Sequence, residues 1–336
     1  MDLNSSNTYN FVLQRYCVNE EIEYNIAENL KSKKLNLLQK LILLSNDVIV
    51  KDFLKNNIKL FKDDINYRNE QGWTALMMAC GNSNHYSNNE IVKLLLENGA
   101  NPNIKDTDGL TALMISCKNT NTDSNNETVK LLLDYKANPN LGNEYGWTAL
   151  MFSSYNTNTT SNNETVKLLL DYKANPNLQD CDGWTALMKS SANTNTTSNI
   201  KTAKLLLDYN ANPNLQDEEG MTALLMSRRC TYTDSNIETV KLLLENNADP
   251  NIISIGKFTS LMLSCRNIDA VRLLLDYNSD FSLEHRLSNN DLDWICNTRR
   301  NMNNVTKILK YKSNLTQNLI IDKISFEDYE FFFKKV

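Results

Sequence analysis

Apolar and polar positions recur along the chain in blocks that are 37 residues long. Five such blocks start at Gly72, Gly109, Gly146, Gly183 and Gly220. Each block has a short apolar run after Gly-x-Thr-Ala-Leu, then a Ser/Asn/Thr-rich stretch, and then a second apolar run containing Leu-Leu-Leu. A fixed period of this size is typical of a solenoid, in which each unit buries its apolar face only by stacking on its neighbours.

One block, residues 109–145, illustrates the elements that the pattern predicts. The dipeptide Asp108-Gly109 predicts a turn, because glycine accepts a positive φ without a Cβ clash. A short helix is expected to begin at Thr111 and run to Cys117. The Asn/Thr-rich residues 119–123 predict a loop, because such side chains compete for backbone hydrogen bonds.

A second helix of the same block is expected to start at Ser124, because Ser124 and Glu127 fit the capping-box pattern. Val129 and the leucines at 131–133 supply its apolar face. The segment 137–140, Ala-Asn-Pro-Asn, is expected to stop the helix, because proline lacks an N–H and disfavours helix in the residue before it. Each unit is therefore predicted to be a helix, a loop, a second helix and a β-turn finger.

Residues 106–116, Asp-Thr-Asp-Gly-Leu-Thr-Ala-Leu-Met-Ile-Ser, resemble the ankyrin pattern Asp-x-x-Gly-x-Thr-Pro-Leu-His-x-Ala. The Val-Lys-Leu-Leu-Leu and Ala-Asn-Pro-Asn half of the block is similar to the second half of that repeat. The resemblance implies an all-α repeat solenoid, an ankyrin stack of helix-loop-helix units with β-turn fingers. Asn-rich arrays of this kind are similar to those of giant DNA viruses.

Two departures from the ankyrin pattern recur. Alanine replaces the proline and methionine usually replaces the histidine, which leaves the hydrogen bonding of that turn open. The period also exceeds the usual length of about 33 residues. From the repeat threonine to the first leucine of the triplet there are 20 residues in five blocks but 14 from Thr259 to Leu273. The surplus therefore falls in long loops between the two helices.

The ends of the array lose the pattern, as the shielding of an open core requires. We expect a flank or cap over 1–34, a degenerate repeat over 35–71, repeats over 72–108, 109–145, 146–182, 183–219 and 220–255, a short repeat over 256–283, and a C-terminal helical cap over 284–336. An alternative for 284–336 is a module that recruits a ubiquitin ligase. Several viral ankyrin proteins carry an F-box-like module there, and residues 319–324 and 331–333 are superficially similar to one.

Composition excludes several classes of partner. The net charge is −5 and no block of basic residues occurs, which argues against binding to nucleic acid or an anionic membrane. The chain has no apolar run of about 18 residues, so no membrane span is expected. The N-terminus does not resemble a signal peptide. We expect an intracellular monomer in the cytoplasm, or in the host cytoplasm if the protein is viral.

Three of the seven cysteines, Cys80, Cys117 and Cys265, share a slot six residues after the repeat threonine. Ser154 and Ser191 occupy the same slot in other repeats, so it is a small-residue position where helices crowd. Stacked equivalents would lie about 10 Å apart, beyond disulfide reach. The sequence therefore predicts reduced thiols.

No catalytic constellation is predicted. His85 and His285 are the only histidines, and neither lies beside a plausible nucleophile. The carboxylates fall on repeat positions, and no glycine-rich phosphate-binding loop occurs. We therefore expect no enzyme activity, no cofactor and no metal.

The ankyrin resemblance implies that the finger tips, and the residue before the repeat threonine, face the concave side and contact ligand. The residue before the threonine is Trp73, Leu110, Trp147, Trp184, Met221 or Phe258. The candidate partner-binding residues are Trp73, Leu110, Glu144, Tyr145, Trp147, Tyr155, Asp182, Trp184, Glu218, Glu219 and Met221. Aromatic residues are frequent interface anchors, but each tryptophan could instead pack across neighbouring fingers to stiffen the stack.

Two functional hypotheses follow from these residues. The first is a non-enzymatic scaffold whose concave face binds a partner protein. The partner's surface is expected to carry basic and apolar residues. The second is a substrate adaptor that recruits a host ubiquitin ligase through residues 284–336.

Overall fold

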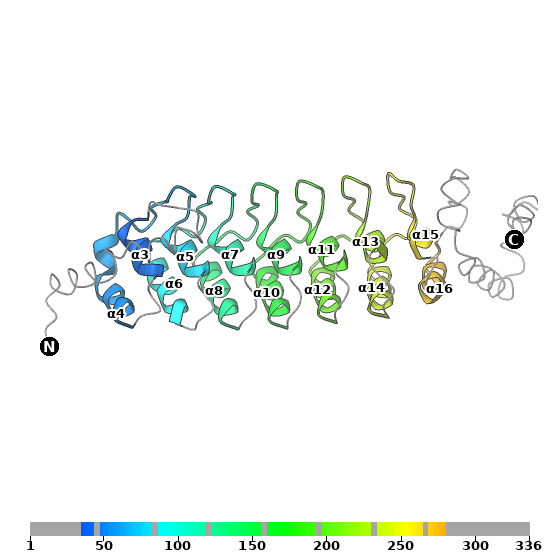
Figure 1. Cartoon of the computed structure of the whole chain (residues 1–336). Helices are drawn as coiled ribbons and strands as arrows, with labels where there is room; N and C mark the ends of the chain where they lie inside the picture. The colour runs from blue at the N-terminus through cyan, green and yellow to red at the C-terminus, as the bar shows by residue number, and fades with distance from the viewer. Residues whose placement is uncertain are drawn as a thin grey trace, which may run out of the picture. The chain divides into compact units, whose positions relative to one another are not determined.

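The computed structural model describes residues 35–43, 48–81, 87–118, 123–155, 160–192, 197–229, 234–264 and 268–279 (Figure 1). It forms two compact units, residues 1–186 with 208–211 and residues 187–207 with 212–336. The expected caps over 1–34 and 284–336, and the alternative recruiting module, lie outside the described residues.

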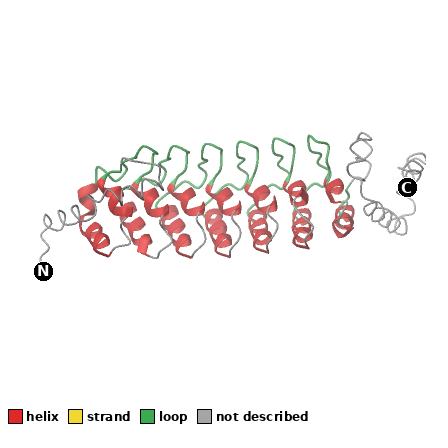
Figure 2. Ribbon diagram, viewed as in Figure 1, coloured by secondary structure: helices red, strands yellow, loops and turns green. Residues whose placement is uncertain are grey.

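Apart from an isolated bridge between Gly142 and Thr148, the regular secondary structure of the described residues is helical, and the fingers between the helices are loops and turns (Figure 2). The first unit contains α3 (Leu37–Leu43), α4 (Val48–Asn57), the 3₁₀ helix η2 (Ile58–Phe61), α5 (Ala75–Gly81), α6 (Ser87–Glu97), α7 (Ala112–Lys118), α8 (Asp123–Asp134), α9 (Ala149–Tyr155) and α10 (Thr160–Asp171). The second contains nearly all of α11 (Ala186–Ala192) and α12 (Thr197–Asp208), then α13 (Ala223–Arg229), α14 (Asp234–Glu245), α15 (Ser260–Ser264) and α16 (Ile268–Asp276). No helix in these ranges is long and apolar enough to cross a membrane.

The helices of each unit are arranged in two rows. In the first unit the short helices α5, α7 and α9 contact one another in series, and each contacts the long helix that follows it. The long helices α6, α8 and α10 form the second row. In the second unit α13 and α15 pair in the same way with α14 and α16. The fingers project beyond the short helices (Figure 2), so the predicted helix-loop-helix stack is confirmed.

The short helices begin one residue later than expected, because the repeat threonine caps them. The Thr148 hydroxyl accepts the N–H of Met151 at 3.3 Å, and Thr74 does the same for Met77. The methionine sulfur in turn accepts the threonine N–H, at 3.4 Å in the first pair and 3.5 Å in the second. Where methionine replaces the histidine, this reciprocal pair therefore supplies hydrogen bonds at the start of the short helix.

The long helices α8 and α10 begin at Asp123 and Thr160, one residue before the expected serines. The side chains of Ser124 and Ser161 lie outside the described part of the chain, so the capping box stays a prediction. Glu127 has a different contact in the structure. One of its carboxylate oxygens accepts the Nδ2–H of Asn89 in the preceding long helix at 2.6 Å, which ties successive repeats together.

The Ala-Asn-Pro-Asn segment does not stop the long helix, contrary to the expectation. In α8 the helix ends at Asp134, and Lys136 takes a left-handed conformation with φ 65°. The N–H of Lys136 donates to the Leu133 carbonyl at 3.0 Å, and that of Ala137 to the Leu132 carbonyl at 2.9 Å. This pattern is a Schellman motif, so the helix has ended before the proline is reached.

An asparagine at the end of each Ala-Asn-Pro-Asn segment joins one repeat to the next. The Asn103 side chain donates to the Lys136 carbonyl at 3.1 Å and accepts the N–H of Asn138 at 2.7 Å. Asn140 makes the equivalent pair of bonds one repeat later, and Asn214 does so in the second unit. Both polar ends of the amide are satisfied by backbone groups that are otherwise left over at a helix end.

The core lies between the two rows of helices. In the leucine triplet of α8, Leu132 and Leu133 are buried, whereas Leu131 is half-buried. Cys80 and Cys117 are fully buried free thiols, and burial raises the pKa of each to about 12. They are therefore protonated and unreactive, which agrees with the expected reduced state.

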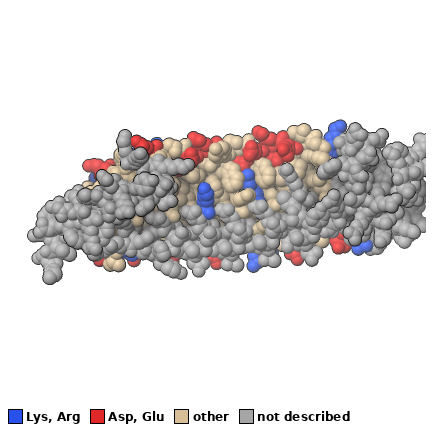
Figure 3. Space-filling view, in the orientation of Figure 1, with Lys and Arg blue, Asp and Glu red and all other residues tan. Residues whose placement is uncertain are grey.

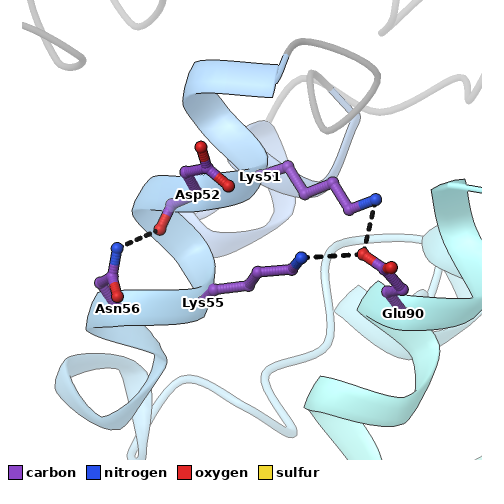
Figure 4. Close-up of polar contacts among 5 residues, drawn as sticks. All are labelled: Lys51, Asp52, Lys55, Asn56 and Glu90. Atoms are coloured by element: carbon purple, nitrogen blue, oxygen red, sulfur yellow. Dashed lines mark hydrogen bonds and ion pairs between the residues drawn. The ribbon is translucent and has the colours of Figure 1, made fainter.

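The first long-helix junction is held by charge. Figure 4 shows Lys51 and Lys55 of α4 pointing toward Glu90 of α6, with Nζ–Oε2 distances of 2.6 and 2.9 Å. Hydrogen bonds from Lys51 and then Lys55, and the positive charge of both, lower the pKa of Glu90 to about 2. Glu90 is therefore ionised at neutral pH.

Candidate protein-binding surface

Each finger is a tight turn built on one Asn or Asp side chain. In the finger Asn143–Trp147, the Asn143 Oδ1 atom accepts the N–H groups of Tyr145 at 3.1 Å and Trp147 at 2.8 Å. The backbone closes the turn, because Asn143 donates to the Trp147 carbonyl and Gly146 donates to the Asn143 carbonyl, both at 3.0 Å. Short polar side chains that bond their own backbone favour such turns, and the finger is rigid as a result.

Neighbouring fingers are joined by backbone hydrogen bonds. The Glu144 N–H donates to the Asp108 carbonyl at 3.1 Å, and the Cys181 N–H donates to the Tyr145 carbonyl at 2.9 Å. Gly109 has φ +76°, and a Cβ there would lie 2.7 Å from the Glu144 nitrogen. Glycine is therefore required both by the conformation and by the close approach of the next finger.

Asp106 shows how the finger acids divide into two kinds. Its carboxylate is buried and accepts the N–H groups of Asp108 and Leu110. Burial is the main cause that raises the pKa of Asp106 above its usual value, and the two backbone hydrogen bonds oppose it. Asp106 is thus a structural residue of the turn, unlike the exposed acid at Asp108.

Trp147 packs on the short helix of its own repeat. Its ring centroid lies 5.1 Å from that of Phe152 and 5.6 Å from that of Tyr155, in tilted and edge-on arrangements. Such geometries are favourable for aromatic pairs. Trp73 lies likewise over the end of its own helix, 3.5 Å from where a Cβ on Gly81 would stand. Trp73 also makes a side-chain hydrogen bond to Asp106 of the next finger, so a tryptophan can pack on its own repeat and contact the neighbouring finger as well.

The predicted binding residues differ in exposure. Exposed residues are Glu144, Tyr145, Tyr155, Asp182, Glu218 and Glu219, and partly buried ones are Trp73, Leu110, Trp147 and Trp184. Met221 is buried, with only 7% of its surface exposed, so it offers little area to a partner. The sequence reasoning missed Phe152. Its place in the short helix, five residues after Trp147, could have indicated it.

We use the name finger face for the fingers 106–110, 143–147 and 180–184 of the first unit, together with Phe152 and Tyr155. Within the described ranges, the carboxylates of its exposed acids Asp108, Glu144 and Asp182 form no ion pair or hydrogen bond. The three fingers contain no lysine or arginine. Acidic atoms gather along the finger edge in Figure 3. The finger face is therefore aromatic and negatively charged.

The described residues offer no group of His, Cys, Asp and Glu side chains that could hold a metal ion.

Glu218 and Glu219 of the second unit are exposed at a finger tip like their counterparts in the first. The Ile255 N–H donates to the Glu219 carbonyl at 2.9 Å, so the same finger ladder occurs in both units.

The chain belongs to the ankyrin repeat family. A family model for ankyrin repeats (three copies) matches residues 11–106, 85–180, 157–254 and 198–285. Together these ranges cover most of the chain, and the helix-loop-helix units and fingers are what that family builds.

Relatives of the chain include ankyrin repeat proteins of a giant virus. The chain is 45% identical over 73 residues to ankyrin repeat protein L86 of Acanthamoeba polyphaga mimivirus, and 52% identical over 58 residues to its L289. These matches span 22% and 17% of this chain but only 12% and 10% of the relatives.

Solved structures confirm the fold. The ankyrin repeat domain of Bcl-3, a member of the IkappaB family, is similar with a TM-score of 0.59 and 24% sequence identity. The similarity covers 72% of this chain and 98% of that one. Ankyrin repeats are generally non-enzymatic modules of protein–protein interaction, and this chain shares that architecture.

Proposed function

We propose that this protein is a non-enzymatic scaffold that binds a partner protein on its finger face, the side that the family resemblance assigns to the concave surface. One observation carries the proposal. Aromatic rings at Tyr145, Trp147 and Tyr155 are exposed or half-exposed on a rigid ladder, beside carboxylates that no group in the described ranges neutralises. Aromatic anchors surrounded by polar groups are typical of interface hot spots.

The rigidity of the finger face supports binding. Asn143 fixes the turn, and backbone bonds from Glu144 and Cys181 join it to the fingers on both sides. Because the rings are held before a partner arrives, little side-chain or loop entropy is lost on association. A partner with basic and apolar residues would complement this face in charge and in hydrophobicity.

The experiment compares three versions of the full chain as baits in a quantitative pull-down. They are the natural chain, a finger variant with Tyr145→Ala and Trp147→Ala, and a control variant with Lys130→Ala and Lys167→Ala. The control lysines are exposed on the long helices α8 and α10. We expect a partner that the natural chain and the control retain and the finger variant loses. A partner that the finger variant keeps, or that both variants lose equally, would show that the finger face does not bind it.

The ligase-adaptor hypothesis is tested with the same baits. Truncation after residue 283 should remove a ligase subunit from the captured set if residues 284–336 recruit one. Capture of the finger-face partner should survive that truncation.

A further inference from the structure

We infer that the cluster around Trp147 binds the guanidinium group of an arginine, presented by an extended segment of the partner protein. The inference rests on the proposed function and adds the chemistry of the group that the finger face recognises. Three features of the first unit support it: an accessible aromatic platform, uncompensated carboxylates on both sides of that platform, and a regular row of finger positions.

The aromatic platform is unusually open for residues of this size. Tyr155 is 49% exposed and Tyr145, two residues before Trp147 in the finger, is 67% exposed, while Trp147 itself is half-buried. Trp147 is held by Phe152 and Tyr155 at ring-centroid distances of 5.1 and 5.6 Å. A cation over an aromatic face is attracted by the ring quadrupole, tryptophan is the best such partner, and arginine is the cation found most often.

The carboxylates lie on the fingers before, at and after Trp147. Backbone bonds bring Asp108 beside Glu144, at 3.1 Å between the Asp108 oxygen and the Glu144 nitrogen, and bring Cys181 beside Tyr145. Asp182, one residue further along that finger, is exposed as well. These fingers contain no lysine or arginine, and the ammonium of Lys105, just before the first of them, donates to the Gly142 carbonyl at 2.5 Å rather than pairing with a carboxylate. A guanidinium can stack on the ring and still donate to a carboxylate through its planar fork.

The row of fingers favours an extended segment over a single isolated side chain. Leu110, Trp147 and Trp184 occupy the same position in three successive fingers, and all three are partly buried. A chain that crosses the ladder would place an arginine on Trp147 and meet apolar surface on both sides. The finger that ends at Trp73 lacks this arrangement. Gln71 stands there in the place of Tyr145, and Gly81 stands in the place of Tyr155.

That difference makes Trp73 a matched control for Trp147. Both tryptophans precede the repeat threonine and lie over the end of their own short helix. Of the two, only Trp147 has an exposed tyrosine, Tyr155, packed against its ring, and a second exposed tyrosine, Tyr145, two residues before it in the finger. Loss of Trp73 removes its packing and also a side-chain hydrogen bond to Asp106. A loss of the arginine preference that is confined to Trp147→Leu therefore reports the cation site.

The test uses fluorescein-labelled nona-arginine and nona-lysine peptides, which carry equal charge, titrated with the full chain at physiological salt and followed by fluorescence anisotropy. We expect the arginine peptide to bind about three- to fivefold more tightly. Trp147→Leu should abolish this preference and Trp73→Leu should keep it. Glu144→Gln with Asp182→Asn should weaken both peptides, and the arginine peptide more, because only the guanidinium fork makes paired hydrogen bonds to a carboxylate.

A second variant guards against a folding defect in Trp147→Leu. Tyr145→Gln with Tyr155→Gln alters two exposed side chains, of which only Tyr155 packs on Trp147, and should also lower the preference for arginine. Equal affinities of the two peptides, or a preference that the Trp147→Leu and tyrosine variants retain, would overturn the inference. Those results would leave the proposed function intact if the pull-down still showed a partner that depends on the finger face. Loss of that partner dependence would instead contradict the proposed function.

Discussion

Replacing Lys136 and Lys173 by glycine is expected to stabilise the protein, because both lysines hold a backbone conformation that suits glycine. Each has φ 65° and sits just past the end of a long helix. The equivalent residue of an earlier repeat is Gly99, with φ +91°, and a Cβ there would meet nothing within 4 Å. The position is therefore open in space, and the cost of lysine lies in the backbone conformation itself.

The magnitude follows from two opposing effects. A left-handed conformation costs a residue with a Cβ roughly 1–2 kcal/mol. Glycine removes that cost, but about 0.4–1 kcal/mol of the resulting stabilisation is lost, because the unfolded chain with glycine is more flexible. The Lys136 and Lys173 side chains make no ion pair or hydrogen bond within the described ranges, so nothing else is lost. We expect about 0.5–1 kcal/mol per site, and about twice that for the double variant.

Urea unfolding followed by circular dichroism measures this change through the midpoint and the slope. The control is Lys136→Ala, which removes the lysine side chain but retains a Cβ in the left-handed conformation. Alanine should leave the midpoint nearly unchanged while glycine raises it. If alanine stabilises as much as glycine does, the lysine side chain was the source of the cost and the reasoning from φ is refuted. A lower midpoint with glycine would refute it as well.

Three further predictions concern the core, the charged junction and the tryptophans. Among the described residues the buried Ser154 hydroxyl has no hydrogen-bond partner, so Ser154→Ala should raise stability by about 1 kcal/mol. Ser153→Ala, which loses a bond to a backbone carbonyl, should not, and equal midpoints of the two variants in thermal unfolding would contradict this. Glu90 has its pKa lowered from 4.5 to about 2, so its contribution is present above pH 4.5 and is lost as the pH falls through about 2. Acid unfolding of Glu90→Gln should therefore be less pH-dependent in that window, and an unchanged curve would count against the ion pairs. Alanine at Trp147 and Trp184 should weaken partner binding by about 2 kcal/mol or more each, and thermal unfolding measured in parallel must stay close to that of the natural chain; lost stability with unchanged intrinsic affinity would mean that both rings are structural.

The sequence by itself determined the local elements of each repeat. The 37-residue period, the two apolar runs and the glycine turn predict two helices and a finger, and the structure contains them. The spacing from threonine to the leucine triplet also assigned the surplus residues to the segment between the helices. These features were predictable because they depend on neighbours within one or two helical turns, where periodicity, caps and positive φ act.

Only the tertiary structure decided how repeats are joined and which side chains the finger face presents. Lys136 follows the end of its helix in a left-handed conformation that a lysine in the sequence does not indicate. The Asn103 amide that bonds the Lys136 carbonyl belongs to the preceding repeat. The burial of Met221 and the partial exposure of Trp147 likewise concern residues at the same place in their fingers. A repeat pattern treats such positions as equivalent, whereas exposure and hydrogen bonding depend on groups about one repeat away in sequence that meet only when the units stack.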